Sequence, residues 1–122
     1  MTKRILVADD EPHIVTALEF VLRRAGYDVE IARSGEEALQ QIERRPPDLV
    51  LLDVMMPVLS GYDVCERLRA RREWMGVKVV MLSARGREAE TSRGLAAGAD
   101  LYVVKPFSNR ELLQKIAALL AG

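Results

Sequence analysis

The sequence predicts one α/β domain, a parallel sheet covered by helices on both faces, and three observations support this. First, five short runs rich in Val, Ile and Leu alternate with five helical segments along the chain. Second, several of these runs are apolar at nearly every position, which is typical of parallel strands buried on both faces. Third, 122 residues, 49% of them hydrophobic, suit one core, so residues 1–122 are interpreted as one domain. The predicted strands lie at 5–7, 29–31, 49–52, 77–82 and 101–104.

Each helical segment between these runs has apolar residues at helical spacing and its own boundary signals. The first begins at Pro12, which suits a first helical turn, and ends at Gly26. The second begins at Ser34 and the last at Ser108, and each has Glu three positions later, the spacing of a capping box. The third begins near Ser60.

The fourth helix, over residues 88–97, is the weakest of the five because alanine supplies most of its apolar residues. A helix that buries little apolar surface is predicted to be among the less stable parts of the fold. Trp74, ahead of the fourth strand, is expected in a loop and partly exposed.

Composition and charge exclude several classes of protein. The 18 basic and 18 acidic residues balance, whereas a nucleic-acid-binding domain usually has a net basic surface. The lone cysteine, Cys65, cannot form an internal disulfide, which fits a reducing compartment. The apolar run at 5–8 is too short for a signal peptide, and no stretch is long enough to span a membrane. We therefore expect a cytoplasmic protein whose domain binds neither nucleic acid nor membrane.

Polar side chains follow four of the five predicted strands at their carboxyl ends. They are Asp9 and Asp10 after the first strand, Asp53 after the third, Ser83 after the fourth and Lys105 after the fifth. Ligands of open α/β sheets bind at this edge, so we expect these groups to converge. Asp9 and Asp10 alone would be interpreted as a helix N-cap and a turn, but the groups on the other strands favour a shared site.

The predicted site combines three carboxylates with an ammonium group and a hydroxyl. The carboxylates would repel one another without a divalent cation, and oxygen ligands suit magnesium or calcium rather than zinc. A carboxylate left free can attack a phosphorus atom, while Lys105 and Ser83 can neutralise charge on the transferred group. Asp53 is the favoured nucleophile, because Asp9 and Asp10 are adjacent and better placed as cation ligands.

Six segments match one protein family in order and spacing: ILVADDE at 5–11, DLVLLDVMMP at 48–57, SG at 60–61, MLSA at 81–84, GAD at 98–100 and KPF at 105–107. Together they resemble the receiver domains of bacterial response regulators, the CheY-like family, over the whole chain, and among them those of OmpR/PhoB-like regulators. The resemblance implies a doubly wound (βα)5, flavodoxin-like three-layer sandwich with parallel strands in the order 2-1-3-4-5.

The resemblance also implies a role in two-component signal transduction. Asp53 would accept a phosphoryl group from the phosphohistidine of a sensor histidine kinase or a phosphotransfer protein. Asp10, Asp53 and the backbone carbonyl of Met55 would bind Mg2+, for which Mn2+ or Ca2+ can substitute, and Asp9 would contribute directly or through water. Lys105 would pair with the phosphoryl group. The chain would not be an enzyme beyond catalysing its own phosphorylation and dephosphorylation.

A switch is a further implication of the resemblance. Ser83 would hydrogen-bond the phosphoryl group and act with Tyr102. The face formed by helix 88–97, strand 101–104 and the last helix would then be remodelled to control an output or a partner. The Lys105–Pro106 peptide bond is expected to be cis.

The same face is expected to form a phosphorylation-dependent homodimer. Asp100, Glu111 and Lys115 partly match the charged dimer face of OmpR/PhoB-like receivers. Leu101 departs from that pattern, since it replaces an acidic residue common there.

Two further positions are expected to set the lifetime of the phosphoryl group. Met55 and Arg85 lie two residues beyond Asp53 and Ser83, where the family controls access of water. A bulky Met and a long Arg are expected to slow hydrolysis.

Three other functions fit these residues less well. A phosphatase of the haloacid-dehalogenase type needs an acid two residues after its nucleophile, where this chain has Met55. A flavodoxin-like cofactor binder needs a loop rich in Gly, Ser and Thr after the first strand, where this chain has an acidic run that begins at Asp9. A receiver-like interaction module working independently of phosphorylation usually lacks one of the acidic or lysine positions, and here all are present.

Overall fold

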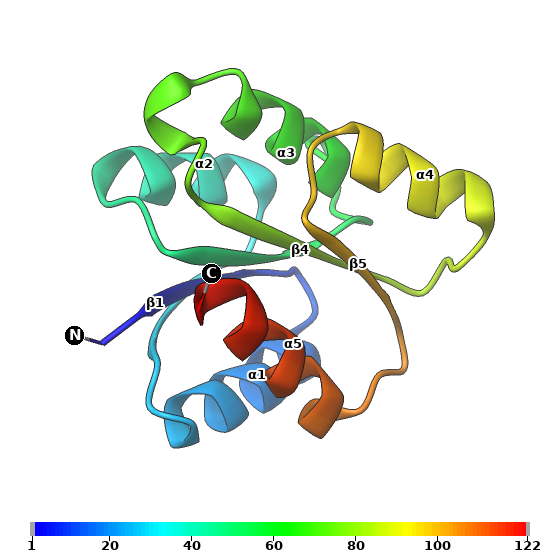
Figure 1. The fold of residues 1–122 in the computed structure, drawn as a ribbon. Helices are drawn as coiled ribbons and strands as arrows, with labels where there is room; N and C mark the ends of the chain where they lie inside the picture. Colours follow the sequence, from blue (N-terminus) through cyan, green and yellow to red (C-terminus); the bar gives the residue numbers. More distant parts are fainter. Residues whose placement is uncertain (1, 122) are drawn as a thin grey trace.

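The computed structural model describes residues 2–121 of the chain. Along these residues five strands alternate with five α-helices (Figure 1). In chain order they are β1 (Arg4–Ala8), α1 (Pro12–Arg24), β2 (Asp28–Ala32), α2 (Gly35–Arg44), β3 (Leu49–Asp53), α3 (Gly61–Arg69), β4 (Lys78–Ser83), α4 (Glu88–Ala96), β5 (Leu101–Val104) and α5 (Asn109–Ala121). A short 3-10 helix at Arg72–Trp74 precedes β4.

The strands form one parallel sheet in the order β2-β1-β3-β4-β5, which confirms the doubly wound topology. Helices α1 and α5 cover one face of the sheet, and α2, α3 and α4 cover the other (Figure 1). Each face has its own apolar cluster. The α1/α5 cluster includes Leu18, Leu22 and Ile116, and the α2/α3/α4 cluster includes Ile42 and Leu68. The fold is therefore a three-layer sandwich, as the resemblance implied.

Alternation along each strand sends its side chains to one cluster or the other. In β3, Leu49 and Leu51 belong to the α1/α5 cluster, whereas Val50 and Leu52 belong to the α2/α3/α4 cluster. All five residues of β3 are buried, because helices cover both faces of the sheet at this central strand. Asp53 ends this strand, so a carboxylate lies at the carboxyl edge of the most enclosed part of the sheet.

Side-chain caps start several helices, and both predicted pairs form in part: Ser34 accepts from the Glu37 N–H, and Ser108 from the Glu111 N–H. Ser34 caps α2 by accepting from the Glu37 N–H at 3.1 Å, but the Glu37 carboxylate accepts from Gln41, so the predicted capping box is only half formed. A complete box stands at α3, where Ser60 and Asp63 cap each other's backbone N–H groups.

The segment before β4 differs from the sequence-based expectation in two ways. Trp74 is buried in the α2/α3/α4 cluster at 5% exposure, because the 3-10 helix turns its ring inward. The Arg71 guanidinium covers that ring at 4.2 Å from its centroid. Val77 lies just before β4 instead of opening it. Within residues 2–121, no helix has the length and apolarity needed to cross a bilayer.

Candidate functional site

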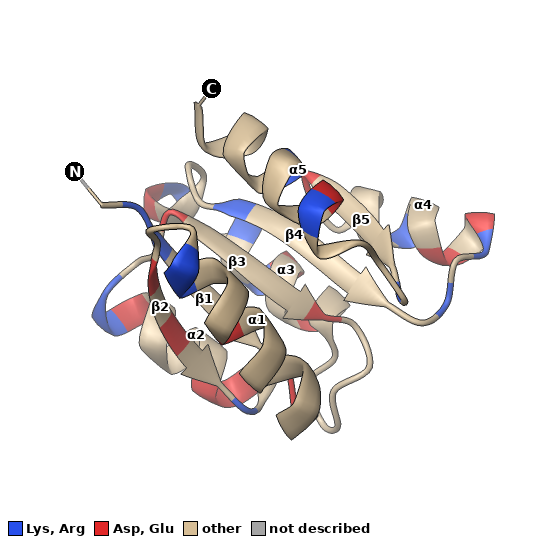
Figure 2. Cartoon of the chain, turned by 90° about the horizontal axis from the view of Figure 1, so that it is seen from below, with Lys and Arg blue, Asp and Glu red and all other residues tan. Residues whose placement is uncertain are grey.

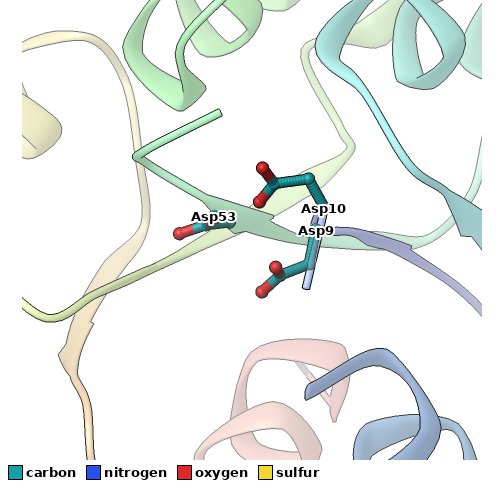
Figure 3. Close-up of side chains that lie close together, drawn as sticks. All are labelled: Asp9, Asp10 and Asp53. Carbon is teal, nitrogen blue, oxygen red and sulfur yellow. The ribbon is translucent and has the colours of Figure 1, made fainter. Parts of the chain in front are cut away.

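Three aspartates meet at the carboxyl edge of the sheet (Figure 3). Asp9 and Asp10 follow β1, and their side chains point to opposite sides of the strand end, while Asp53 ends the neighbouring β3. Each offers a carboxylate oxygen within 4.8 Å of the other two. Asp9 and Asp53 are buried at 1% and 3% exposure, and Asp10 is exposed. The predicted convergence of these three carboxylates is confirmed.

Lys105 reaches the same edge from the end of β5. Its Nζ atom lies 3.3 Å from Asp9 Oδ2 and 3.4 Å from Asp53 Oδ1. The Glu11 carboxylate also lies 3.6 Å from this nitrogen, although Glu11 was not among the predicted site residues. Its place directly after Asp9 and Asp10 in the sequence could have indicated that Glu11 lies at this site. The ammonium group therefore sits between the two buried aspartates and is partly enclosed by them.

Burial and like charge make the aspartates weaker acids. Burial, and next the negative charge of Asp9, raise the pKa of Asp53 to about 6 against the attraction of Lys105. Burial also raises the pKa of Asp9. The Glu11 N–H donates to Asp9 Oδ1 at 2.9 Å, and this hydrogen bond lowers the Asp9 pKa by less than burial raises it. Burial lowers the pKa of the Lys105 ammonium, but the Asp53 and Asp9 carboxylates outweigh it and raise the pKa overall. A concentration of negative charge thus remains at this edge.

The donor set fits a hard divalent cation. Within residues 2–121, Lys105 is in salt-bridge contact with Asp9, Asp53 and Glu11, whereas no cationic side chain lies within that distance of Asp10. Three carboxylates with one ammonium leave an excess of negative charge at oxygen ligands, and such ligands suit Mg2+ or Ca2+. Residues 2–121 contain no competing His/Cys cluster in this position.

Ser83 and Tyr102 lie on the α4 side of the sheet. The Tyr102 side chain packs against the α2/α3/α4 cluster. Its hydroxyl donates to the carbonyl oxygen of Arg85 at 2.8 Å. The Arg85 N–H in turn donates to Ser83 Oγ at 3.0 Å. The loop after β4 therefore links the two predicted switch residues. The predicted cis peptide bond at Lys105–Pro106 is confirmed.

The loop from Asp53 to α3 is tightly built. The Met55 N–H donates to Asp53 Oδ1 at 3.4 Å, while the Met55 side chain is 51% exposed. A Cβ atom on Gly61 would lie 2.6 Å from the Asp53 carbonyl oxygen, so only glycine allows this approach. Val58 has a φ of 69° and centres a γ-turn in which the Leu59 N–H donates to the Pro57 carbonyl. This turn is strained for a β-branched residue.

The geometry agrees with a comparison of the sequence with family models. Residues 5–117 match the model of the response regulator receiver domain. The chain belongs to this family. It is thus a receiver domain of the two-component response regulators, and its strand order and cis bond are those expected of a receiver.

Curated relatives of this receiver are transcriptional regulators by name. The chain is 48% identical over 120 residues to the alkaline phosphatase synthesis transcriptional regulatory protein PhoP of Bacillus subtilis, covering 98% of the chain and 49% of that protein. It is 44% identical over 120 residues to the phosphate regulon transcriptional regulatory protein PhoB of Rhizobium meliloti, covering 98% and 53%. The chain spans about half the length of the curated relatives it matches.

Solved structures show the same fold. The receiver superposes with a TM-score of 0.92 on a CheY-like response regulator receiver domain protein from Methanospirillum hungatei. The two are 35% identical, and the match covers 99% of this chain and 95% of the other.

One residue of the expected dimer face has a different environment. The Asp100 carboxylate accepts from the Arg69 guanidinium at 3.0 Å and from the Val79 N–H at 2.8 Å. These partners belong to the same chain, so Asp100 ties the start of β5 to α3 and β4. Glu111 and Lys115, by contrast, are exposed on α5.

Proposed function

We propose that this receiver accepts a phosphoryl group on Asp53 from the phosphohistidine of a sensor histidine kinase or a phosphotransfer protein. One observation carries the proposal: the Lys105 ammonium lies 3.4 Å from Asp53 and 3.3 Å from Asp9, beside a third carboxylate. The half-buried Lys105 ammonium is thus within reach of a phosphoryl group carried by Asp53. The carboxylate of Asp53 ends the central strand, where it contacts Lys105 and accepts from the Met55 N–H.

The transfer is a displacement at phosphorus. An Asp53 oxygen forms a bond to the phosphorus atom while the bond from phosphorus to the donor's histidine nitrogen breaks. The donor's phosphorylated ring carries a proton on its other nitrogen, and the electron pair of the broken bond stays on the leaving nitrogen, so the imidazole leaves neutral. Lys105 then pairs with a phosphoryl oxygen while keeping its contact with Asp9.

A divalent cation completes the charge balance in this proposal. Asp10, Asp53 and the Met55 carbonyl would hold Mg2+, with Asp9 close enough to act directly or through water. When bound, Mg2+ supplies positive charge that offsets the carboxylates and the incoming phosphoryl group. The chain's own contribution is to place these oxygen atoms at the end of two adjacent strands, with Asp9 and Asp53 shielded from solvent.

The response to phosphorylation would pass through the loop after β4. The Ser83 hydroxyl, which now accepts from the Arg85 N–H, would turn to a phosphoryl oxygen. The Arg85 carbonyl also accepts from the Tyr102 hydroxyl, so a movement of this loop would change the position of the Tyr102 side chain. The face made by α4, β5 and α5 would be remodelled as a result.

Acetyl phosphate with Mg2+ tests the phosphorylation step directly. The intact wild-type protein is expected to gain the mass of one phosphoryl group, and Asp53→Asn to gain none. Glu11→Gln is the matched control, because it removes an exposed acid near Lys105 and leaves all three aspartates. Equal gain by wild type and Asp53→Asn would show that another residue is phosphorylated. No gain by the wild type would favour an interaction module that works independently of phosphorylation.

A homodimer through α4, β5 and α5 is the proposed output state, controlling transcription in a longer regulator as the relatives' names suggest. Glu111 and Lys115 are available on α5, whereas the Asp100 carboxylate already binds Arg69. Charges of both signs are interspersed on α5 in Figure 2, which suits pairing of two copies better than binding to nucleic acid. Sedimentation with and without beryllofluoride, a phosphoryl mimic, tests this. Glu111→Lys should weaken the dimer, and an unchanged monomer in all states would refute it.

A further inference from the structure

Helix α4 buries little of its own surface and has no side-chain cap among the described residues. Of its nine residues, all described, only Gly94 is buried. Within residues 2–121, no side chain caps its N-terminus. The position of α4 must therefore depend on groups that reach it from other elements.

Tyr62, at the start of α3, is one such group. It is 6% exposed, and its hydroxyl donates to the carbonyl oxygen of Glu90, in the first turn of α4, at 3.3 Å. The Arg93 guanidinium, one turn further along α4, lies 4.1 Å from the centroid of the Tyr62 ring. The Tyr62 side chain thus contacts α4 twice: its hydroxyl through a hydrogen bond and its ring face through a cation–π contact.

Tyr102 contacts the same part of α4 from the sheet. A Cβ atom on Gly94 would lie 2.7 Å from Tyr102 Cδ2 and 2.9 Å from Met81 Sδ, so the absent side chain makes the space for the ring. The two phenols are neighbours: burial, and next the nearby Tyr102 phenol, raise the pKa of Tyr62 to about 12. Tyr62 from α3 and Tyr102 from β5 therefore converge below one turn of α4.

We propose that Tyr62 is a second positioning residue of the switch, whose hydroxyl anchors α4 in the arrangement that holds the Tyr102 ring against Gly94. This inference rests on the proposed phosphorylation of Asp53. It adds a connection from α3 to α4 to the switch. It also gives Tyr62, in the first turn of α3, a function that depends on its hydroxyl. Sequence reasoning could not find it, since a tyrosine here reads as an apolar core residue.

The expected direction follows from the hydrogen bonds of the loop after β4. Phosphorylation draws Ser83, and with it the Arg85 backbone that binds the Tyr102 hydroxyl. In this proposal the remodelling is a shift in population: phosphorylation favours the packed position of Tyr102, in which its hydroxyl binds the Arg85 carbonyl, over positions in which that hydrogen bond is broken. A hydrogen bond that stabilises this position must strengthen binding of a phosphoryl mimic by the same factor, because coupling between sites is reciprocal. One uncharged hydrogen bond corresponds to a change of about two- to tenfold in affinity.

Tyr62→Phe tests the proposal because it removes the hydroxyl and keeps the ring under Arg93. The probe is beryllofluoride with Mg2+, titrated into the full chain and followed by the NMR signals of the Gly94 and Arg85 amides. Tyr62→Phe should weaken binding about two- to tenfold. Tyr27→Phe is the matched control, since Tyr27 is half-buried against the opposite, α1/α5 cluster. Its affinity should equal that of the wild type.

Three outcomes decide the matter. Unchanged or tighter binding by Tyr62→Phe overturns the inference, even if the variant is less stable, because a purely structural hydroxyl would affect both states alike. A full effect of Tyr62→Phe in a Tyr102→Ala background also overturns it, since the anchor would then act without the Tyr102 ring. Failure of the wild type to bind beryllofluoride would overturn both the phosphorylation proposal and the role of Tyr62. If the wild type binds and Tyr62→Phe binds equally well, only the role of Tyr62 is overturned.

Discussion

Replacing Asp53 by Asn should stabilise the protein in the absence of divalent cations. The Asp53 pKa of about 6 lies roughly two units above its ordinary value of 3.8. Each unit is worth about 1.4 kcal/mol, so ionisation of Asp53 costs the folded state about 3 kcal/mol. This balance already includes the attraction of Lys105. Asparagine has nearly the same shape and does not ionise, so the variant avoids the cost.

The sign of the pH dependence makes this prediction sharp. Because the folded state holds the Asp53 proton more tightly than the unfolded state, wild-type stability from this group falls as pH rises from about 4 to about 6. The gain in free energy of unfolding from Asp53→Asn should therefore be about 3 kcal/mol near pH 8 and close to zero near pH 4.

Urea denaturation at these two pH values, with a chelator present, measures the difference. Glu66→Gln is the control, because Glu66 is an exposed carboxylate on α3, and it should change neither value. An equal gain at both pH values would show that shape or hydrogen bonding, and not charge, is responsible. A loss near pH 8 would refute the reasoning outright. Added Mg2+ should stabilise the wild type and not the variant, because the cation binds the folded carboxylate site.

Four further substitutions probe other parts of the molecule. Val58→Gly should raise the free energy of unfolding by about 1 kcal/mol, because it relieves a positive φ at a residue that is 89% exposed; a loss in urea denaturation would mean the turn is not strained. Leu52→Ala should lower it by about 2–5 kcal/mol, since Leu52 is fully buried, and a smaller loss would indicate that the core collapses around the cavity. Met55→Asn and Arg85→Glu should each speed loss of the phosphoryl group, timed by mass spectrometry after acetyl phosphate is removed; unchanged rates would show that neither residue limits access of water.

Much of the fold could be predicted because its signals are local. The strands are short runs rich in Val, Ile and Leu, and β5 begins and ends where the sequence predicts. The carboxyl ends of parallel strands share one edge, so the sequence alone places Asp9, Asp53 and Lys105 together. The order of the strands needed the family resemblance, since alternation alone does not fix it.

The remaining features depend on contacts between segments far apart in sequence. Trp74 is buried because a short 3-10 helix turns it toward the core, and no local pattern marks that turn. Asp100 is held by Arg69, thirty-one positions away, a partner that its place in the sequence does not indicate. The Tyr62 hydroxyl reaches a carbonyl of another helix. Partners of this kind are chosen by packing, and sequence spacing gives no indication of them.

The place of β1 in the sheet has a consequence for synthesis. Although β1 is made first, it lies between β2 and β3, so its second edge stays open until β3 has been made. At that step Asp9 and Asp53 come together, but Lys105 follows β5, which joins last through β4. The nascent three-stranded unit therefore carries two facing acids without their ammonium partner. The Lys105 ammonium can reduce the repulsion between Asp9 and Asp53 only after β5 has been made. We therefore expect this edge of the sheet to close tightly late in synthesis.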